Sequence, residues 1–198
     1  MLYEAEGGDS VVMPKNEPIL LYHGSYCEVS SPDLSRCSRY KDFGRGFYLT
    51  TSREQAERFS RTSLKKAIVN GLADESRLYG VVSCFECAET ELSGLRIRAF
   101  EDADSDWLLC VAGHRKRLND IIEKYRDYDV IIGKIADDAT NAAITAYLSG
   151  VYGPLGSEKA AEFCIGMLLP NRLKDQLCFR TEAALACLNF TGSCKIWK

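Results

Sequence analysis

The chain has 198 residues, of which 46% are hydrophobic and 27% charged, which suits one globular domain and excludes a collagen-like, coiled-coil or wholly disordered protein. Its net charge is −3, and neither half is basic: residues 1–99 carry 13 basic and 14 acidic side chains, and residues 100–198 carry 12 and 14. Strong binding to nucleic acid through bulk charge is therefore not indicated, which leaves only a local basic groove for such a role.

The first 17 residues are acidic and contain glycine, with no basic start and no apolar core, so they do not resemble a secretory signal. We expect residues 1–17 to form a flexible extension and residues 18–198 to form one domain. No run of about 18 apolar residues occurs, so we expect no membrane-spanning helix. The nine cysteines are an odd number without a paired framework, which favours reduced thiols in a cytoplasmic protein. Delivery into another cell stays compatible with these features.

The start of the domain predicts two strands and a helix. Residues 18–23 have the pattern of a strand, the polar residues 30–41 predict a loop, and residues 46–51 predict a second strand. Ser52 and Gln55 have capping-box spacing, so a helix begins after Ser52. Small and apolar residues then recur at helical spacing, which predicts a narrow buried face made of Ala56, Phe59, Ser60, Ser63, Leu64 and Ala67.

The rest of the chain alternates irregularly between strand-like and helical segments. Strands are predicted at residues 78–87, 95–100, 130–132, 176–180 and 195–197. Helices are predicted around residues 107–111, 141–148 and 158–169, and a short helix with Ala184, Leu185 and Leu188 on one face follows a cap at Thr181. The order is neither a regular βαβ alternation nor all-β, so we predict the α+β class.

Cys84 and Cys87 form the only CxxC pattern in the chain. A structural zinc site needs four ligands, usually from two such pairs. The pair lies in an apolar, strand-like run, so we interpret these cysteines as buried side chains and expect no metal site.

Two segments near the N-terminus contain residues suited to chemistry. His23 ends a strand, where it can present a ring nitrogen to a cleft while Gly24 lets a ligand approach the backbone; a histidine bonded within the core is the alternative. Gly44 and Gly46 directly precede the second strand and permit a bulge or a close ligand approach. Strand alternation turns Tyr48 away from its core-facing neighbours, although an aromatic residue in a strand is often part of the core.

Together with Gln176, which opens a late strand, these segments resemble the three motifs of the histidine–tyrosine–glutamate clade of ADP-ribosyltransferases. More closely, the chain resembles a bacterial family of uncharacterised ADP-ribosyltransferase-like domains called DUF3990. The similar segments are Leu-Tyr-His-Gly-Ser (21–25), Asp-Phe-Gly-Arg-Gly-Phe-Tyr-Leu-Thr-Thr (42–51), Trp107-Leu108, Asp-Tyr-Asp (127–129), Ala-Asp-Asp (136–138) and Gln-Leu-Cys-Phe-Arg-Thr-Glu (176–182). The resemblance spans about residues 19–196 and implies a split antiparallel β-sheet that binds NAD.

The resemblance also implies roles for individual residues. His23 would hydrogen-bond the adenosine ribose, Gly24 and Ser25 would contact the nicotinamide side, and Tyr48 would stack on the nicotinamide ring. Gln176 would occupy the third catalytic position. The loop before the second strand completes the expected cofactor-binding set with Phe43, Gly44, Arg45 and Gly46.

Gln176 departs from the glutamate pattern of the clade. An amide keeps a hydrogen-bond acceptor but supplies neither charge nor a general base, which disfavours polymer elongation and favours single transfer or NAD hydrolysis. Asp175 and Glu182 are nearby carboxylates that could compensate, although Glu182 also suits the first turn of a helix.

Other charged clusters have simpler explanations beside functional ones. The acids at positions 127, 129, 137 and 138 could hold a metal or position a base, or form a solvated loop. His114, Arg115, Lys116 and Arg117 could contact phosphate, or stabilise the C-terminus of a helix. The loop cations Arg36, Arg39, Lys41 and Arg45 could meet the NAD pyrophosphate or a target.

We therefore expect a mono-ADP-ribosyltransferase that cleaves NAD and transfers ADP-ribose to a macromolecule, with protein favoured over nucleic acid as the acceptor. The alternatives are a nucleic-acid-modifying enzyme of the same type and a pseudoenzyme that binds NAD or ADP-ribose without turnover. The resemblance also suggests a toxin-like or effector-like role, with an antitoxin or regulatory partner.

Overall fold

The structure is a computed structural model that describes residues 18–135, 138–168 and 174–197. The expected flexible extension, residues 1–17, lies outside the described residues. The strands are β1 Ile19–Ser25, β2 Phe47–Thr50, β3 Tyr79–Cys87, β4 Ile97–Ala99, β5 Val130–Lys134, β6 Asp175–Phe179 and β7 Asn189–Trp197. The helices are α1 Arg53–Val69, α2 Glu89–Leu92, α3 Ser105–Lys116, α4 Asn119–Lys124, α5 Asp138–Leu148, α6 Glu158–Leu168 and α7 Glu182–Leu185, with a 3-10 turn at Leu34–Arg36.

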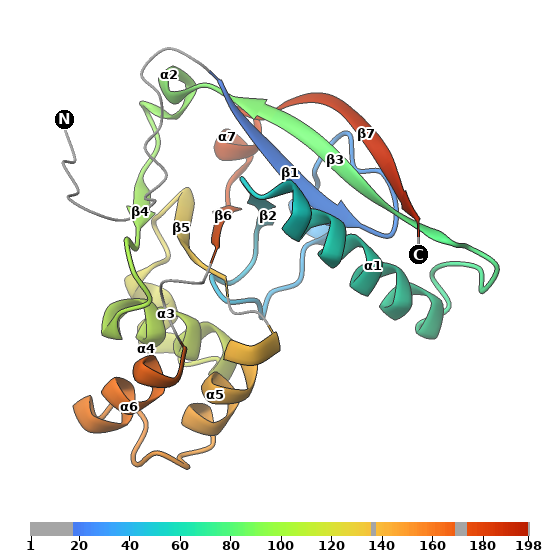
Figure 1. Cartoon of the computed structure of the whole chain (residues 1–198). Helices are drawn as coiled ribbons and strands as arrows, with labels where there is room; N and C mark the ends of the chain where they lie inside the picture. Colours follow the sequence, from blue (N-terminus) through green and yellow to red (C-terminus); the bar gives the residue numbers. More distant parts are fainter. Residues whose placement is uncertain (1–17, 136–137, 169–173, 198) are drawn as a thin grey trace.

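The strands form one sheet in the order β4-β5-β6-β2-β1-β3-β7 (Figure 1). β4 and β5 run parallel, and the other neighbouring strands run antiparallel. β1 pairs with β3 along its whole length, whereas the ladder described between β1 and β2 consists of one pair, Tyr22 with Thr50. The sheet therefore divides at the β1–β2 junction into two halves, β4-β5-β6-β2 and β1-β3-β7.

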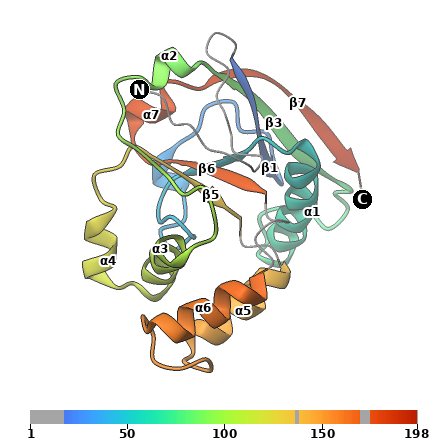
Figure 2. The same ribbon diagram turned by 60° about the vertical axis from the view of Figure 1, so that its left-hand side comes forward.

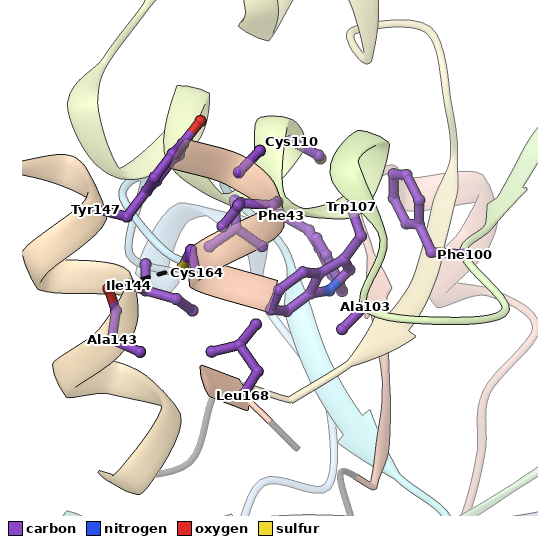
Figure 3. Close-up of a cluster of buried hydrophobic side chains, with 14 of the residues drawn as sticks. Phe43, Phe100, Ala103, Trp107, Cys110, Ala143, Ile144, Tyr147, Cys164 and Leu168 are labelled. Carbon is purple, nitrogen blue, oxygen red and sulfur yellow. Dashed lines mark hydrogen bonds between the residues drawn. The ribbon is translucent and has the colours of Figure 1, made fainter. Parts of the chain in front are cut away.

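Helices cover the two halves separately. α1 packs on β1 and β3, and α3, α5 and α6 gather beside the half that contains β5 and β6 (Figure 2). The core beneath α3, α5 and α6 is shown in Figure 3, where side chains from these helices surround Phe43 and Trp107. Among its members are Phe100, Ala103, Cys110, Ala143, Ile144, Tyr147, Cys164 and Leu168. The mainly antiparallel sheet with grouped helices is consistent with the predicted α+β class.

A second core joins the two halves. Its buried members include Leu21 from β1, Phe47 from β2, Phe85 from β3 and Phe179 from β6. Because Phe47 and Leu49 belong to this core while Tyr48 packs against the core of Figure 3, the predicted alternation along β2 is confirmed. The junction therefore has its own apolar contacts on each side of β2.

The predicted strands and the main helices are confirmed, with some differences at their ends. β7 is much longer than the predicted strand 195–197 because its first residues pair with β3. The short helices α2 and α4 have no counterpart in the prediction. The helix predicted over residues 158–169 ends at Leu168, and residue 169 lies outside the described ranges. Thr181 caps α7 as predicted, accepting a hydrogen bond from the Ala184 N–H at 3.2 Å.

The expected face of α1 is only partly correct. Ala56, Ser60, Leu64 and Ala67 are buried, but Phe59 is 52% exposed. The helix comes close to the glycines of β1 and β3 at its small residues Ala56 and Ser60. Phe59 lies beside that interface, where the Lys41 ammonium is 5.9 Å from its ring centroid. The capping box is half formed: Ser52 caps the helix, but its own N–H donates to Thr50 Oγ1 instead of to Gln55.

The two cysteines of the CxxC pattern pack on different cores. Cys87 is buried in the core that joins the halves, and the partly buried Cys84 packs under α1. A spacing of three in an extended strand separates the two side chains, which suits packing better than a shared ligand. No helix within the described ranges is long and apolar enough to cross a lipid bilayer.

Candidate functional site

The first two motifs are in contact at the β1–β2 junction through the His23 side chain and the Tyr48 backbone, while the Tyr48 side chain lies on the opposite face of the sheet from His23. The His23 Nδ1 atom lies 2.8 Å from the Tyr48 carbonyl oxygen, and the imidazole ring lies 4.4 Å from the Phe47 ring, centroid to centroid. A carbonyl oxygen can only accept, so Nδ1 carries the hydrogen and donates it. This leaves Nε2 of the neutral ring as an acceptor. Burial lowers the pKa of His23, with the Tyr48 carbonyl opposing the shift, so the ring is neutral at pH 7.

The Tyr48 hydroxyl holds the loop that precedes β2. It donates to the Gly44 carbonyl at 2.8 Å and accepts from the Phe43 N–H at 2.9 Å. Burial raises the pKa of Tyr48 well above its usual value of 10, so the hydroxyl stays protonated. The hydroxyl therefore has a structural task, and the ring is the part of Tyr48 that could meet a ligand.

The other loop residues are packed against the protein. Phe43 is fully buried in the core of Figure 3. Gly44 has φ +79°, and a Cβ atom there would lie 2.6 Å from the His114 ring, so a side chain at this position is excluded twice. A Cβ at Gly46 would lie 2.4 Å from Cys178 Sγ. Arg45 donates from Nε to the Leu34 carbonyl at 2.7 Å, so two segments of the loop between β1 and β2 are hydrogen-bonded to each other through these residues.

Gly24 and Ser25 are also buried. A Cβ atom at Gly24 would lie 2.1 Å from the Ala56 carbonyl oxygen, so this glycine is needed for the close approach of α1. Ser25 ends β1 opposite Val81 and is 9% exposed. The space that a side chain at position 24 would occupy is therefore filled by helix α1 and not left open for a ligand, as the sequence had suggested.

Gln176 lies one strand away from the junction. It pairs with Thr50 of β2 and Gly133 of β5, and it is 8% exposed. Its Nε2 atom donates to Asp42 Oδ2 at 3.2 Å and to the Lys134 carbonyl at 3.4 Å. Because neighbouring residues on paired strands share a face, Gln176 and Cys178 lie on the same side of the sheet as Tyr48. The third motif is therefore brought beside the second.

Asp42 is the residue of this site to which sequence analysis assigned no role. Its Oδ1 atom accepts from Arg115 Nε at 2.8 Å and forms an ion pair with Arg115 Nη2 at 2.7 Å. Arg115 in turn donates from Nη1 to Asn141 Oδ1 at 2.8 Å. The only signal in the sequence is that Asp42 opens the segment that contains the second motif; its partners lie 73 and 134 residues away.

The two carboxylates proposed to compensate for Gln176 are placed differently. Asp175 forms an ion pair with Lys134 at 3.1 Å, with both side chains largely buried. Glu182 is exposed in the first turn of α7, beyond the other end of β6. Asp42 is thus the carboxylate that contacts the Gln176 side chain.

The basic cluster at the end of α3 is divided between core and surface. His114 is 2% exposed, its Nδ1 donates to the Cys110 carbonyl at 2.9 Å, and its buried Nε2 has no hydrogen-bond partner among the described residues. Arg115 belongs to the ion pair with Asp42, and Arg117 lies over the Tyr40 ring at 3.8 Å. Contact with phosphate is therefore not available to His114 in this structure.

The acidic positions and the remaining loop cations are also accounted for. Asp129 accepts from the Arg96 N–H and from the Thr181 hydroxyl, and exposed Asp127 pairs with Arg96 at 3.5 Å. Asp137 lies outside the described residues, and the Asp138 side chain is not described. Three cations of the loop remain exposed: Arg36, Arg39 and Lys41.

The two histidines predict how stability depends on pH. Burial lowers the pKa of both His23 and His114, and these are the only histidines of the chain. Below about pH 6.5 the unfolded chain takes up protons that the folded state resists, so the free energy of unfolding should fall as pH decreases from 7 toward 5. Thermal melts across this range should show the loss.

A His23→Gln/His114→Gln variant tests the origin of that slope. Its melting temperature should change much less between pH 7 and pH 5 than that of the wild type. Equal slopes in the two proteins would mean that other groups cause the pH dependence.

Comparison with known proteins identifies the family of the chain. A family model described as "Protein of unknown function (DUF3990)" matches residues 19–190, which cover all three motifs. The comparison with curated proteins found no match. The chain therefore belongs to the DUF3990 family of proteins of unknown function.

Proposed function

We propose that this protein is an NAD-dependent mono-ADP-ribosyltransferase. The observation that carries the proposal is the hydrogen bond between His23 and the Tyr48 carbonyl at a junction where one residue pair joins the two halves of the sheet. This contact brings together two motifs that are 25 residues apart and resemble the NAD-binding motifs of ADP-ribosyltransferases. The divided, mainly antiparallel sheet also supports the fold that the resemblance implies.

NAD would bind at the β1–β2 junction and pass between the two halves of the sheet, because His23 and the Tyr48 ring lie on opposite faces. His23 Nε2 would accept a hydrogen bond from a ribose hydroxyl because Nδ1 already donates to the protein. The Tyr48 ring would contact the flat, cationic nicotinamide, for which an aromatic face is suited. The exposed cations Arg36, Arg39 and Lys41 would reach the pyrophosphate or the acceptor.

The reaction would break the bond between the nicotinamide nitrogen and C1′ of the ribose. The bonding electron pair leaves with nicotinamide, which becomes neutral, and positive charge develops on the ribose. A nucleophilic atom of the acceptor then bonds to C1′ and gives its proton to water. The oxygen of the Gln176 amide would stabilise the cationic ribose through a hydrogen bond to a hydroxyl, without acting as a base.

Binding predicts a measurable stabilisation. NAD at about 100 times its Kd should stabilise the folded state by about 2.7 kcal/mol, which is roughly 5–10 °C in melting temperature for a chain of this size. His23→Ala should abolish the rise. Tyr48→Phe keeps the ring and should retain it at a lower basal stability, because the two hydrogen bonds to the loop are lost. A wild-type protein indifferent to millimolar NAD would refute the proposal.

Turnover and the class of acceptor are tested together. The protein is incubated with NAD labelled on its adenine part and with cell lysate, and the products are digested separately with nuclease and protease. For the protein acceptor that we favour, the label should resist nuclease, be lost with protease, and depend weakly on salt. Label destroyed by nuclease, with transfer that falls steeply between low and physiological salt, would identify a nucleic-acid acceptor instead.

A pseudoenzyme that binds NAD or ADP-ribose is the second candidate. It is favoured by the third motif, where an amide that donates inward to Asp42 replaces a carboxylate. This candidate predicts the rise in melting temperature with NAD but no release of nicotinamide.

A further inference from the structure

The Gln176 side chain is held in one orientation by the protein. An amide nitrogen has two hydrogens, and the structure gives Nε2 two acceptors, Asp42 Oδ2 and the Lys134 carbonyl. The Lys134 carbonyl also accepts from the indole N–H of Trp107, which is fully buried, so this acceptor is fixed by the core. If the amide were turned over, its oxygen would face Asp42 Oδ2 and the Lys134 carbonyl, and no hydrogen would lie between these acceptors. The Oε1 atom is therefore the part of the amide left for a ligand.

Asp42 is itself anchored so that one oxygen serves Gln176. Two of the three Arg115 side-chain nitrogens, Nε and Nη2, contact Oδ1, which leaves Oδ2 to accept from Gln176. The side chains of Asp42 and Arg115 are only 14% and 19% exposed, so water weakens this contact less than it would on an open surface. The carboxylate is a charged acceptor, which makes its hydrogen bond to the amide stronger than a neutral one.

We propose that Asp42 is a positioning residue for the transferase reaction, which orients the Gln176 amide and polarises it, so that its oxygen is a stronger acceptor than that of an unpaired amide. This inference rests on the proposed function. Donation to a carboxylate draws electron density toward the amide oxygen, since hydrogen bonds in a chain polarise one another. The oxygen then becomes a better acceptor for a ribose hydroxyl as positive charge develops.

Two ion pairs lie near the Gln176 amide, and the polarisation of the amide is assigned to Asp42. Arg115 lies on the far oxygen of the carboxylate, and the Lys134 ammonium pairs with Asp175 at 3.1 Å. Both carboxylates are therefore ion-paired, and Asp42 differs from Asp175 in accepting a hydrogen bond from the Gln176 amide. The competing explanation is that the Asp42–Arg115 ion pair only stabilises the fold. The two explanations predict different kcat values for variants at positions 42 and 176.

The test compares Asp42→Asn, Gln176→Glu and the double variant in nicotinamide release from NAD. Asp42→Asn keeps an acceptor for Arg115 but removes the charge. We therefore expect kcat to fall about 10-fold to 100-fold, the usual range for residues that orient a directly acting side chain, with little change in KM. The double variant reverses the pair, with an amide at position 42 that donates to a carboxylate at position 176. It should recover most of the lost kcat.

The single Gln176→Glu variant adds a second measurement, the pH–rate profile, which a purely structural role of Asp42 would not change. Two carboxylates about 3 Å apart share a proton, so one of them has a raised pKa. The pH–rate profile of this variant should gain a titration that is absent from both the wild type and the double variant. Asp106→Asn, which weakens the ion pairs with Arg98 and Lys124 away from the site, is the matched control and should keep the wild-type kcat.

Each result has a defined meaning. An active wild type with unchanged kcat in Asp42→Asn, or a double variant no better than Asp42→Asn, would overturn the role of Asp42 and leave the proposed function standing. A wild type that releases no nicotinamide would overturn both. If Asp42→Asn does not fold, the double variant, which retains a hydrogen bond between positions 42 and 176, decides between the two explanations through its kcat and pH profile.

Discussion

Gln176→Ala should reduce the turnover of NAD by about 10²-fold or more, the scale for one preorganised contact to a developing charge. The change removes the amide oxygen expected to face the ribose and leaves Asp42 Oδ2 without its donor. The affinity for NAD should change much less, because in the proposed complex His23 and Tyr48 would make the contacts with bound NAD. Nicotinamide release and the NAD-dependent rise in melting temperature measure the two quantities separately.

The stability of the same variant provides the control. The loss of a buried hydrogen-bond partner costs about 1–3 kcal/mol, and the Lys134 carbonyl keeps its bond from Trp107, so Gln176→Ala should remain folded. A folded variant with wild-type turnover would place the chemistry on another group. Asp175, already paired with Lys134, and the distant Glu182 would then be tested next.

Gly24→Ala should destabilise the protein by about 3 kcal/mol or more, at or beyond the usual limit for overpacking. The added Cβ would lie 2.1 Å from the Ala56 carbonyl oxygen and 2.9 Å from the Ser60 nitrogen, and both are backbone atoms of α1. Neither atom can rotate away, so β1 and α1 would have to separate. Thermal or urea unfolding at pH 7 measures the loss.

Gly166→Ala is the matched control for this effect. Gly166 lies within α6, and a Cβ there has no neighbour within 4 Å in the described part of the chain. The substitution should therefore stabilise the protein by about 0.5–1 kcal/mol through helix propensity. A Gly24→Ala variant as stable as the wild type would show that α1 does not lie against Gly24 of β1.

Local patterns in the sequence were sufficient for most of the fold. The alternation of Phe47, Tyr48 and Leu49 predicted both β2 and its two faces, because side chains on a strand alternate whatever lies above them. Ser52 and Thr181 predicted helix starts, because a capping side chain acts within three residues of itself. The short motifs around His23 and Tyr48 also indicated which strands to examine for a site.

Local patterns were not sufficient where the partner is distant in the chain. Helical spacing placed Phe59 on the buried face of α1, but the interface is too close for a large ring, and this depends on glycines in β1 and β3. β7 was underestimated because its first residues gain strand structure from pairing with β3. Periodicity gives the direction of a side chain relative to its own element, but not the distance to the next one.

The sequence by itself determined most of the strands and the longer helices, the candidate residues His23, Tyr48 and Gln176, and the absence of a carboxylate at the third motif. Only the tertiary structure decided that Gly24 contacts α1, that the Tyr48 hydroxyl holds its own loop, and that Asp42 contacts Gln176 across 134 residues. The physical reason is that hydrogen bonds and ion pairs between distant segments depend on how sheet and helices pack together. Asp42 precedes β2, and it contacts Gln176 because β2 lies beside β6. The ion pair with Arg115 of α3 holds the Asp42 carboxylate in place.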